Sequence, residues 1–307
     1  MSVRIGLGIA TFPFASVKNF WRWIELCEEN GIDSFWQTDR IVSPQPFMES
    51  MAMMAAVAGA TKRLKFGMNV VVLPFRDPML LAKECATIDF LSEGRLLAAF
   101  GVGADIAPEW RAMGISTKGR GRRTDEALQL LQRFWTEESV THEGEFYHYT
   151  DAAVAPKPTQ DPLPLWIGGS SKAAIRRTAT LGTGWLAGLQ TPQQVAPVVA
   201  AIKEQSAAAG RPLDDDHYGA GFAYRFGSWD DPIVERAASA LRRRLQVEFE
   251  PSQYYAVGGS AEIIARAEDY KRAGVSKFVL STLADNDDDL ISQTQRLIDE
   301  VVPVVHD

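Results

Sequence analysis

The stretch from Lys65 to Gly103 constrains the fold most, because a strand, a helix and a second strand follow one another there without interruption. Residues 66–73 are apolar and rich in β-branched side chains with no alternation, which is typical of a strand buried on both faces of a parallel sheet. Asp77 can cap a helix over residues 78–91, and another apolar run begins at Leu96. The stretch predicts a β-α-β crossover, and parallel folds bind ligands just beyond such strand ends.

The same alternation of strand-like and helix-like segments continues along the chain. The predicted strands are residues 3–10, 34–38, 66–73, 96–100, 163–167, 184–186, 218–226 and 277–280. The predicted helices are residues 17–30, 47–60, 78–91, 120–135, 171–181, 192–209, 261–273 and 288–302. Eight strands that alternate with eight helices predict an α/β protein with a closed (β/α)₈ TIM barrel. The lack of an early G-x-G-x-x-G motif argues against a Rossmann fold.

Length and linker composition predict one domain over residues 1–307, since no low-complexity segment divides the chain. Three irregular stretches are expected to be loop insertions at the C-terminal face of the barrel, where they would form the walls of a substrate pocket. They are residues 104–118, 136–162 and 227–259. The second contains a plausible small hairpin with its turn near Glu143 and Gly144.

Composition and charge narrow the classes of partner. A net charge of −7 argues against a nucleic-acid partner. The absence of a signal-peptide pattern and of a long apolar run predicts a cytoplasmic protein with no membrane partner. Cys27 and Cys85 lie on apolar helix faces and are expected to be buried thiols. The four histidines show no metal-ligand spacing, so we expect no metal.

Two polar features stand at predicted strand ends. Gly168-Gly169-Ser170-Ser171 can form an anion site, because glycines allow close approach of backbone N–H groups and serines cap the next helix; an ordinary capped turn is the alternative. Asn69 is an amide within an apolar strand, so it either pairs with a neighbouring strand or points out of the barrel mouth toward a polar ring system.

Charged residues also stand near predicted strand ends and helix starts. Glu109, beside Trp110, can act as a general acid or base, or can simply begin a short helix. A basic cluster near the start of a predicted helix can contact a phosphate or carboxylate, or can pair with Asp125 and Glu126 as a solvated face. The cluster consists of Lys118, Arg120, Arg122 and Arg123.

Several segments together resemble the bacterial luciferase-like superfamily of flavin and deazaflavin oxidoreductases. They are SFWQTD at 34–39, NVVVLPFRDPMLLAKECATIDFLSEGRL at 69–96, FGVG at 100–103, RGRRTDEALQLLQRFW at 120–135, WIGGSS at 166–171 and VGGSAEIIARAEDYKRAGVSKFVLS at 257–281. The resemblance implies a (β/α)₈ barrel that binds FMN or the deazaflavin F420 at the carboxyl ends of the strands. Members transfer a hydride between cofactor and substrate, or insert oxygen with reduced FMN supplied by a separate flavin reductase.

The resemblance also implies roles for particular residues. The phosphate of the cofactor would sit at Gly168–Ser170, with Gly184 and Trp185 as the adjacent wall, and the third strand would carry a bulge, often with a cis non-proline peptide bond. The implied cofactor-binding residues are Asn69, Val70, Gly101, Gly103, Gly168, Gly169, Ser170, Gly184 and Trp185.

The implied catalytic residues are Asp39, Arg40 and Glu109. Many relatives have a histidine after the aspartate, whereas this chain has Arg40. An arginine stays protonated and cannot readily serve as a base, but it can bind an anionic substrate or a flavin oxygen. Asp39 is expected to orient Arg40 or to hold the polar edge of the ring, with a surface ion pair as the alternative.

Three functional classes follow. The first is an FMN-dependent monooxygenase or reductase, the second an F420-dependent hydride transferase, and the third a barrel that has lost its cofactor, against which the retained glycines argue. The overall acidity favours FMN, since the acidic oligoglutamate tail of F420 would prefer a basic groove. Expected partners are a small-molecule substrate, a separate flavin reductase and, from the resemblance, a second copy in a homodimer.

Overall fold

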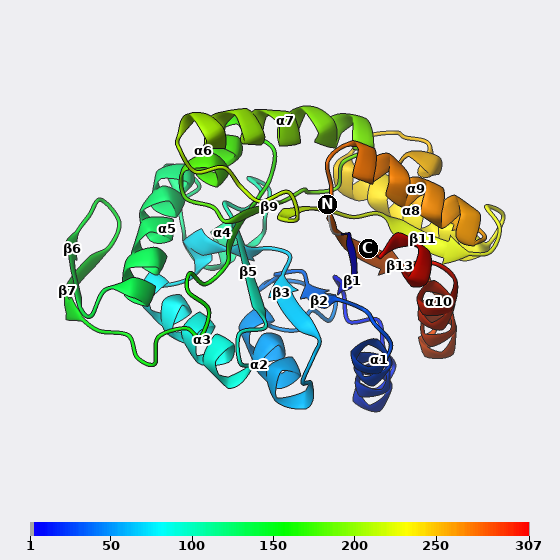
Figure 1. Ribbon diagram of the computed structural model, residues 1–307, viewed down its shortest axis with the longest axis horizontal. Helices are drawn as coiled ribbons and strands as arrows, with labels where there is room; N and C mark the ends of the chain where they lie inside the picture. The colour runs from blue at the N-terminus through cyan, green and yellow to red at the C-terminus, as the bar shows by residue number, and fades with distance from the viewer. Residues whose placement is uncertain (1–2, 307) are drawn as a thin grey trace.

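Eight parallel strand positions close into a barrel in the computed structural model, which describes residues 3–306 (Figure 1). Their order around the barrel is β1 (Arg4–Ile9), β2 (Ser34–Gln37), β3 (Lys65–Met68) with its continuation β4 (Val71–Val72), β5 (Leu96–Gly101), β8 (Leu165–Gly168), β9 (Gly184–Leu186), β10 (Tyr218–Ala220) with its continuation β11 (Ala223–Phe226), and β13 (Lys277–Thr282). The barrel closes where β1 pairs with β13, with Arg4 opposite Lys277. The predicted (β/α)₈ barrel is confirmed.

Helices surround the strands, and each of the eight predicted helices is present. They are α1 (Val17–Glu29), α2 (Ser50–Ala60), α3 (Pro78–Leu91), α5 (Arg120–Thr136), α6 (Lys172–Thr180), α7 (Pro192–Ala208), α9 (Ser260–Arg272) and α10 (Asp287–Glu300). Shorter elements are η1 (Leu73–Phe75), α4 (Glu109–Ala112), η2 (Pro251–Gln253) and α11 (Val302–Val305). Asp77 caps α3 as predicted, since its carboxylate accepts a hydrogen bond from the Leu80 N–H at 3.0 Å.

The interior of the barrel is filled by a compact apolar cluster. Its members are Trp36, Leu97, Ala99, Trp166, Leu186 and Val279, with Val70 packed against them. The two indole rings lie 6.1 Å apart, and Gly67 makes room for one of them, because a Cβ there would meet the Trp36 ring at 2.7 Å. Because bulky side chains fill the centre of the barrel, the space for ligands lies at the strand ends.

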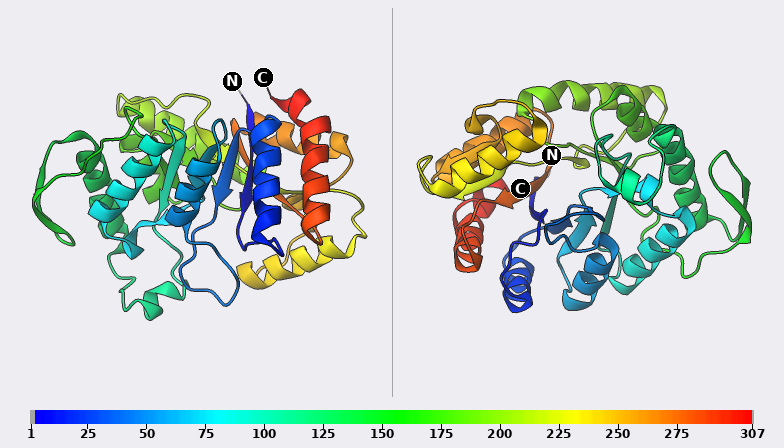
Figure 2. Two further views of the ribbon diagram at one scale, coloured as in Figure 1. Left: turned by 90° about the horizontal axis from the view of Figure 1, so that it is seen from below. Right: turned by 180° about the vertical axis from the view of Figure 1, so that it is seen from behind.

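Two of the three predicted insertions lie at the carboxyl ends of the strands. Residues 104–118 contain α4, and residues 227–259 contain a helix, α8 (Pro232–Leu245), and a strand, β12 (Tyr255–Gly258), that extends the sheet beside β11. The sequence analysis missed both of these larger elements. Figure 2 shows α4 and α8 at the end of the barrel opposite the marked chain ends.

The third insertion is placed differently, and the expectation for it is wrong. Residues 136–162 form the hairpin of β6 (Val140–Glu143) and β7 (His148–Ala152), but this segment follows α5 and so leaves from the amino end of the barrel. The hairpin lies along the outside of the barrel near α5 and α3 (Figure 1). The N–H of Phe146 donates to Glu126 at 3.1 Å, and the Tyr149 hydroxyl donates to Asp77 at 3.0 Å.

Helix α3 exposes several large apolar side chains. Leu80 is 58 % exposed and Leu91 is 67 % exposed, and Met79 and Phe90 are exposed beside them. The neighbouring helix α2 consists almost entirely of alanine, methionine, glycine and valine. A helix that is apolar on its outer face usually packs against a partner. Within residues 3–306, no helix has the length and apolar character needed to cross a bilayer.

Candidate cofactor and substrate site

Asp39 holds three segments together at the carboxyl end of the barrel. Its carboxylate accepts hydrogen bonds from both terminal nitrogens of Arg76, at 2.7 and 2.8 Å. It also accepts from the Val72 N–H and from the Ser50 hydroxyl, each at 3.0 Å. The Asp39 side chain is 2 % exposed, so its oxygens are fully engaged within the protein. The guanidinium that Asp39 orients is therefore that of Arg76 and not that of Arg40, and the alternative of a surface pair is also wrong.

Glu109 contacts the loop that follows Asp39. One of its oxygens accepts hydrogen bonds from the N–H groups of Ile41 and Val42, both at 3.2 Å, and the other lies 3.4 Å from Nη1 of Arg40. The Glu109 side chain is 3 % exposed, whereas that of Arg40 is 35 % exposed. Glu109 thus begins a short helix, which was one of the two alternatives for this residue. The fold also brings it next to Arg40 at the strand ends.

Asn69 and Val70 form the bulge between β3 and β4, and the peptide bond between them is cis, as the resemblance implied. Asn69 lines a hollow of about 280 Å³ at the mouth of the barrel, together with Thr38, Leu186, Ala220, Phe222 and Ser281. Within residues 3–306 the Asn69 side chain has no hydrogen-bond partner. Of the two alternatives for this amide, the structure favours the one in which it faces the mouth.

Val70 explains two of the glycines that were assigned to the cofactor. A Cβ on Gly101 would lie 2.7 Å from Cγ2 of Val70, and a Cβ on Gly168 would lie 2.9 Å from its Cγ1. These glycines leave space for the bulge, and both also line the hollow described next, so their assignment to the cofactor stays a prediction. Gly103 adopts a φ of +75°, which favours glycine, and its missing side chain leaves room for Val72.

A second hollow, of about 180 Å³, lies at the loop after β8. Gly168, Gly169, Ser170 and Ser171 line it, and Ser171 caps α6 by accepting the Ala174 N–H at 3.2 Å. In the part of the chain that the structure describes, the N–H groups of Ser170 and Ser171 have no acceptor. Free N–H groups before a helix start make an anion site.

The N–H of Gly169 is not among these free donors. It donates to the Leu186 carbonyl at 3.2 Å, and Nε1 of Trp185 donates to the Gly169 carbonyl at 2.7 Å. Gly169 has a φ of +103°, so glycine is needed there for the turn. Gly184 and Trp185 are buried in β9 and are not among the residues that line the hollow, so the expectation that they form its wall stays a prediction.

Arg177 lines this hollow, and the basic cluster belongs to the start of α5 and the loop before it. Arg177 is bound by Asp125 at 2.5 Å, whereas Arg120 pairs with Asp105 and Arg122 pairs with Glu145. The cluster thus forms ion pairs, although with other acids than those expected.

Arg123 differs from its neighbours in the cluster. Its guanidinium lies 5.3 Å from the centre of the Phe146 ring, and its buried Nε has no hydrogen-bond partner. Lys118, Arg123 and Lys172 form no ion pair within the described residues, so their positive charge is available to an acidic ligand.

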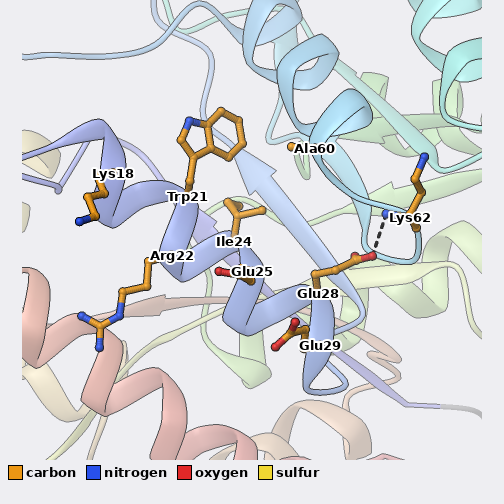
Figure 3. Close-up of a pocket in the computed structure, with 9 residues that line it drawn as sticks. All are labelled: Lys18, Trp21, Arg22, Ile24, Glu25, Glu28, Glu29, Ala60 and Lys62. Atoms are coloured by element: carbon orange, nitrogen blue, oxygen red, sulfur yellow. Dashed lines mark hydrogen bonds between the residues drawn. The ribbon is translucent and has the colours of Figure 1, made fainter.

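A larger hollow lies away from the strand ends. It measures about 620 Å³ and is lined by α1 side chains such as Trp21 and Glu28 and by residues at the end of α2 (Figure 3). The groove is open and mixed in charge, so it is not the candidate site. Asp214, Asp216 and His217 place their ligand atoms within 4.8 Å of one another, at the amino end of β10. The expectation of no metal stays a prediction.

Sequence analysis missed Arg76 and Thr38. Arg76 lies in the loop that follows β4. Its partner Asp39 is 37 residues away in the sequence, so the pair can be seen only in the folded structure. The burial expected for Cys27 and Cys85 is confirmed.

Comparison with known proteins gives the family. The model of the family described as luciferase-like monooxygenase matches residues 3–284. An uncharacterised protein of Mycobacterium tuberculosis (strain H37Rv) is 34 % identical over 168 residues, which cover 54 % of this chain and 57 % of that protein. An F420-dependent glucose-6-phosphate dehydrogenase of Amycolatopsis mediterranei is 29 % identical over 203 residues, which cover 61 % of this chain and 59 % of that enzyme. The chain thus aligns with somewhat over half the length of these relatives.

Solved structures confirm the fold. An F420-dependent secondary alcohol dehydrogenase in complex with an F420–acetone adduct superposes with a TM-score of 0.86 at 19 % identity, over 100 % of both chains. The oxygenating constituent of 3,6-diketocamphane monooxygenase of Pseudomonas putida, in complex with FMN, superposes with a TM-score of 0.80 at 18 % identity, over 99 % of both chains. The family match over residues 3–284 carries the assignment: this chain belongs to the luciferase-like monooxygenase family of flavin- and deazaflavin-dependent oxidoreductases.

Proposed function

We propose that this protein is an F420-dependent oxidoreductase that transfers a hydride between F420 and a small organic substrate. The observation that carries the proposal is the hollow at the loop after β8, with free N–H groups on Ser170 and Ser171. These donors suit a phosphate, and Lys118, Arg123 and Lys172 suit the acidic tail of F420. The named curated relatives at 29 to 31 % identity are F420-dependent enzymes, which also supports this choice.

The local charge outweighs the acidity of the whole chain as a guide to the cofactor. The net charge of −7 favoured FMN in the sequence analysis, but a bound tail responds to charges within about 10 Å, because salt screens more distant ones. We therefore place FMN-dependent monooxygenation second. It shares the same phosphate hollow and mouth, and it needs no basic groove.

The residues present fit a bound deazaflavin in two places. Ser170 and Ser171 would hold the phosphate, and Asn69 would offer its free amide to the polar edge of the ring above Val70. When bound, F420 supplies a carbon that donates or accepts a hydride. Arg40 would face the substrate beside it, and Glu109 and Asp39 are positioning residues that fix the loop after β2.

Titration with the two cofactors tests this proposal. Absorbance or fluorescence changes on adding F420 or FMN to the purified protein give the two dissociation constants. F420 should bind at least about tenfold more tightly than FMN, and raising the salt concentration from 50 to 500 mM should weaken F420 more than FMN. Tighter binding of FMN would overturn the proposal and favour the monooxygenase alternative.

Charge-neutral variants show whether the basic residues act as proposed. Arg123→Gln and Lys172→Gln should each reduce the preference for F420 over FMN while leaving FMN affinity within about twofold. Lys203→Gln is a matched control, because Lys203 lies on α7 and pairs with Asp215. A preference that is unchanged in both test variants would show that these cations do not select the cofactor.

A further inference from the structure

A third hollow lies beside the mouth of the barrel and surrounds Arg40. It measures about 80 Å³ and is lined by Arg40, Ile41, Phe75, Ala104, Ala107 and Glu109, among others. This volume is less than a third of that of the hollow at the mouth, which measures about 280 Å³. It suits one polar group of a substrate better than the ring system of a cofactor.

The Arg40 guanidinium supplies the free hydrogen-bond donors of this hollow. Both oxygens of Asp39 are bound by Arg76, Ser50 and the Val72 N–H. Glu109 is bound by two backbone N–H groups and lies 3.4 Å from one nitrogen of Arg40. Within residues 3–306 this long contact is the one hydrogen bond of the Arg40 guanidinium, which carries five N–H donors.

Arginine suits one kind of ligand at this position. It remains protonated, so it cannot take a proton from a substrate hydroxyl, but its planar fork binds carboxylates through two parallel hydrogen bonds. Glu109 also lines the hollow, but its oxygens already accept hydrogen bonds from the Ile41 and Val42 N–H groups and from one nitrogen of Arg40, so the other N–H groups of the guanidinium are available to an added oxyanion.

Apolar side chains flank the hollow. Ile41 lines it and is exposed, and Ile106 lies between Ala104 and Ala107 in the adjacent loop with its side chain almost fully exposed. Exposed aliphatic side chains next to a binding hollow favour a ligand with an organic body.

We propose that the Arg40 hollow binds the carboxylate of the substrate, so that the substrates are small organic acids with an apolar body. This inference rests on the proposed function, since it names the substrate class of the same site. It assigns Arg40 as the residue that selects charged over neutral substrates, and it assigns Glu109 to holding Arg40 and its loop in place.

Paired probes of equal shape test the inference. Butyrate and butyramide differ in charge but hardly in size, and calorimetric titration of each into the protein measures binding without any turnover. Wild type should bind butyrate at least about tenfold more tightly than butyramide, because a charge-assisted pair is roughly twice as strong as a neutral one. This ratio should fall to about one in Arg40→Gln and should be partly kept in Arg40→Lys.

Arg111→Gln is the matched control, because Arg111 lies on α4 near the hollow but does not line it; its ratio should equal that of wild type. Thermal unfolding followed by circular dichroism shows whether Arg40→Gln still folds, and Arg40→Lys keeps the test valid if it does not. A ratio near one in wild type, or an undiminished ratio in Arg40→Gln, would overturn the inference.

The same protein samples separate this inference from the proposed function. Titration with F420 is performed on each variant by absorbance. Binding of F420 with no preference for butyrate refutes the carboxylate hollow and leaves the proposed function intact. A preference for butyrate that depends on Arg40, without binding of F420, supports the hollow and refutes the choice of cofactor.

Discussion

Ser171→Asp separates the stability of α6 from the binding of a phosphate. The Ser171 hydroxyl caps the helix by accepting the Ala174 N–H, and it also lines the hollow with the free N–H groups. Aspartate caps a helix as well as serine does, and the first turn of α6 contains no acidic residue. The substitution therefore keeps the cap and adds a negative charge to the proposed phosphate site.

The expected loss of affinity follows from Coulomb's law. Two unit charges about 4 Å apart repel by roughly 1 kcal/mol in water and by roughly 4 kcal/mol at the effective dielectric constant of a protein surface. Cofactor affinity should thus fall by about fivefold to several hundredfold, since 1.4 kcal/mol corresponds to a factor of ten. The interaction of the new carboxylate with the helix dipole should leave stability unchanged or raise it by about 0.3 to 1 kcal/mol.

Fluorescence titration with F420 and urea denaturation measure the two effects on one sample. Ser171→Asn is the matched control, because asparagine is also a good cap and carries no charge. Its affinity should stay within about threefold of wild type. If Ser171→Asp folds with normal stability and binds F420 as tightly as Ser171→Asn does, the phosphate does not occupy this hollow.

Four further predictions follow from the same contacts. Asp39→Ala should lower the free energy of unfolding by about 3 kcal/mol, because it leaves the buried Arg76 guanidinium with the half-exposed Glu49 as its remaining partner; a loss below about 1 kcal/mol in urea denaturation would contradict the clamp. Asn69→Ala should lower kcat by roughly tenfold to a hundredfold and change F420 affinity by less than about threefold. Equal losses of kcat and of F420 affinity would show that the amide does not act at the reacting ring. The wild-type chain should be a dimer in light scattering and Leu80→Glu a monomer, whereas a wild-type species of 33.8 kDa would exclude the pair. Burial lowers the pKa of His306, whose Nε2 accepts the Ile5 N–H at 2.7 Å. The unfolded chain therefore takes up this proton at a higher pH, and stability should fall as the pH drops below about 6.5; a wild-type pH profile identical to that of His306→Gln would rule this out.

The barrel could be predicted from the sequence because its signals are local. Unbroken apolar runs such as residues 66–73 indicate buried parallel strands, and caps such as Asp77 mark where helices begin. The helix expected over residues 47–60 begins at Ser50, since Glu49 forms its cap by accepting the Ala52 N–H. Helix α8 was missed although Asp231 and Pro232 gave a start signal of the same kind.

The partners of the charged residues could not be predicted, because they depend on how the loops meet in space. Arg40 follows Asp39 directly in the sequence, yet the fold turns Asp39 toward Arg76 and turns Arg40 toward Glu109. The hairpin after α5 was expected at the wrong end of the barrel. Its sequence predicts its shape correctly, but whether a loop lies at the carboxyl or the amino end depends on which element precedes it.

The glycines show the same limit on a smaller scale. Gly101 and Gly168 resemble residues that let a ligand approach, and in the structure both accommodate Val70 as well as lining the hollow after β8. Sequence alone cannot distinguish these two reasons for the absence of a side chain. The free N–H groups of Ser170 and Ser171, which carry the proposed phosphate site, follow from the backbone course and not from residue type.

A crystal structure of the protein with F420 tests the central claim most directly. The account predicts that the phosphate accepts hydrogen bonds from the Ser170 and Ser171 N–H groups and that the deazaflavin ring lies at the mouth against the Asn69–Val70 bulge. The small hollow around Arg40 should stay free of the cofactor. A phosphate bound elsewhere, or a ring that lies away from the bulge, would contradict the account.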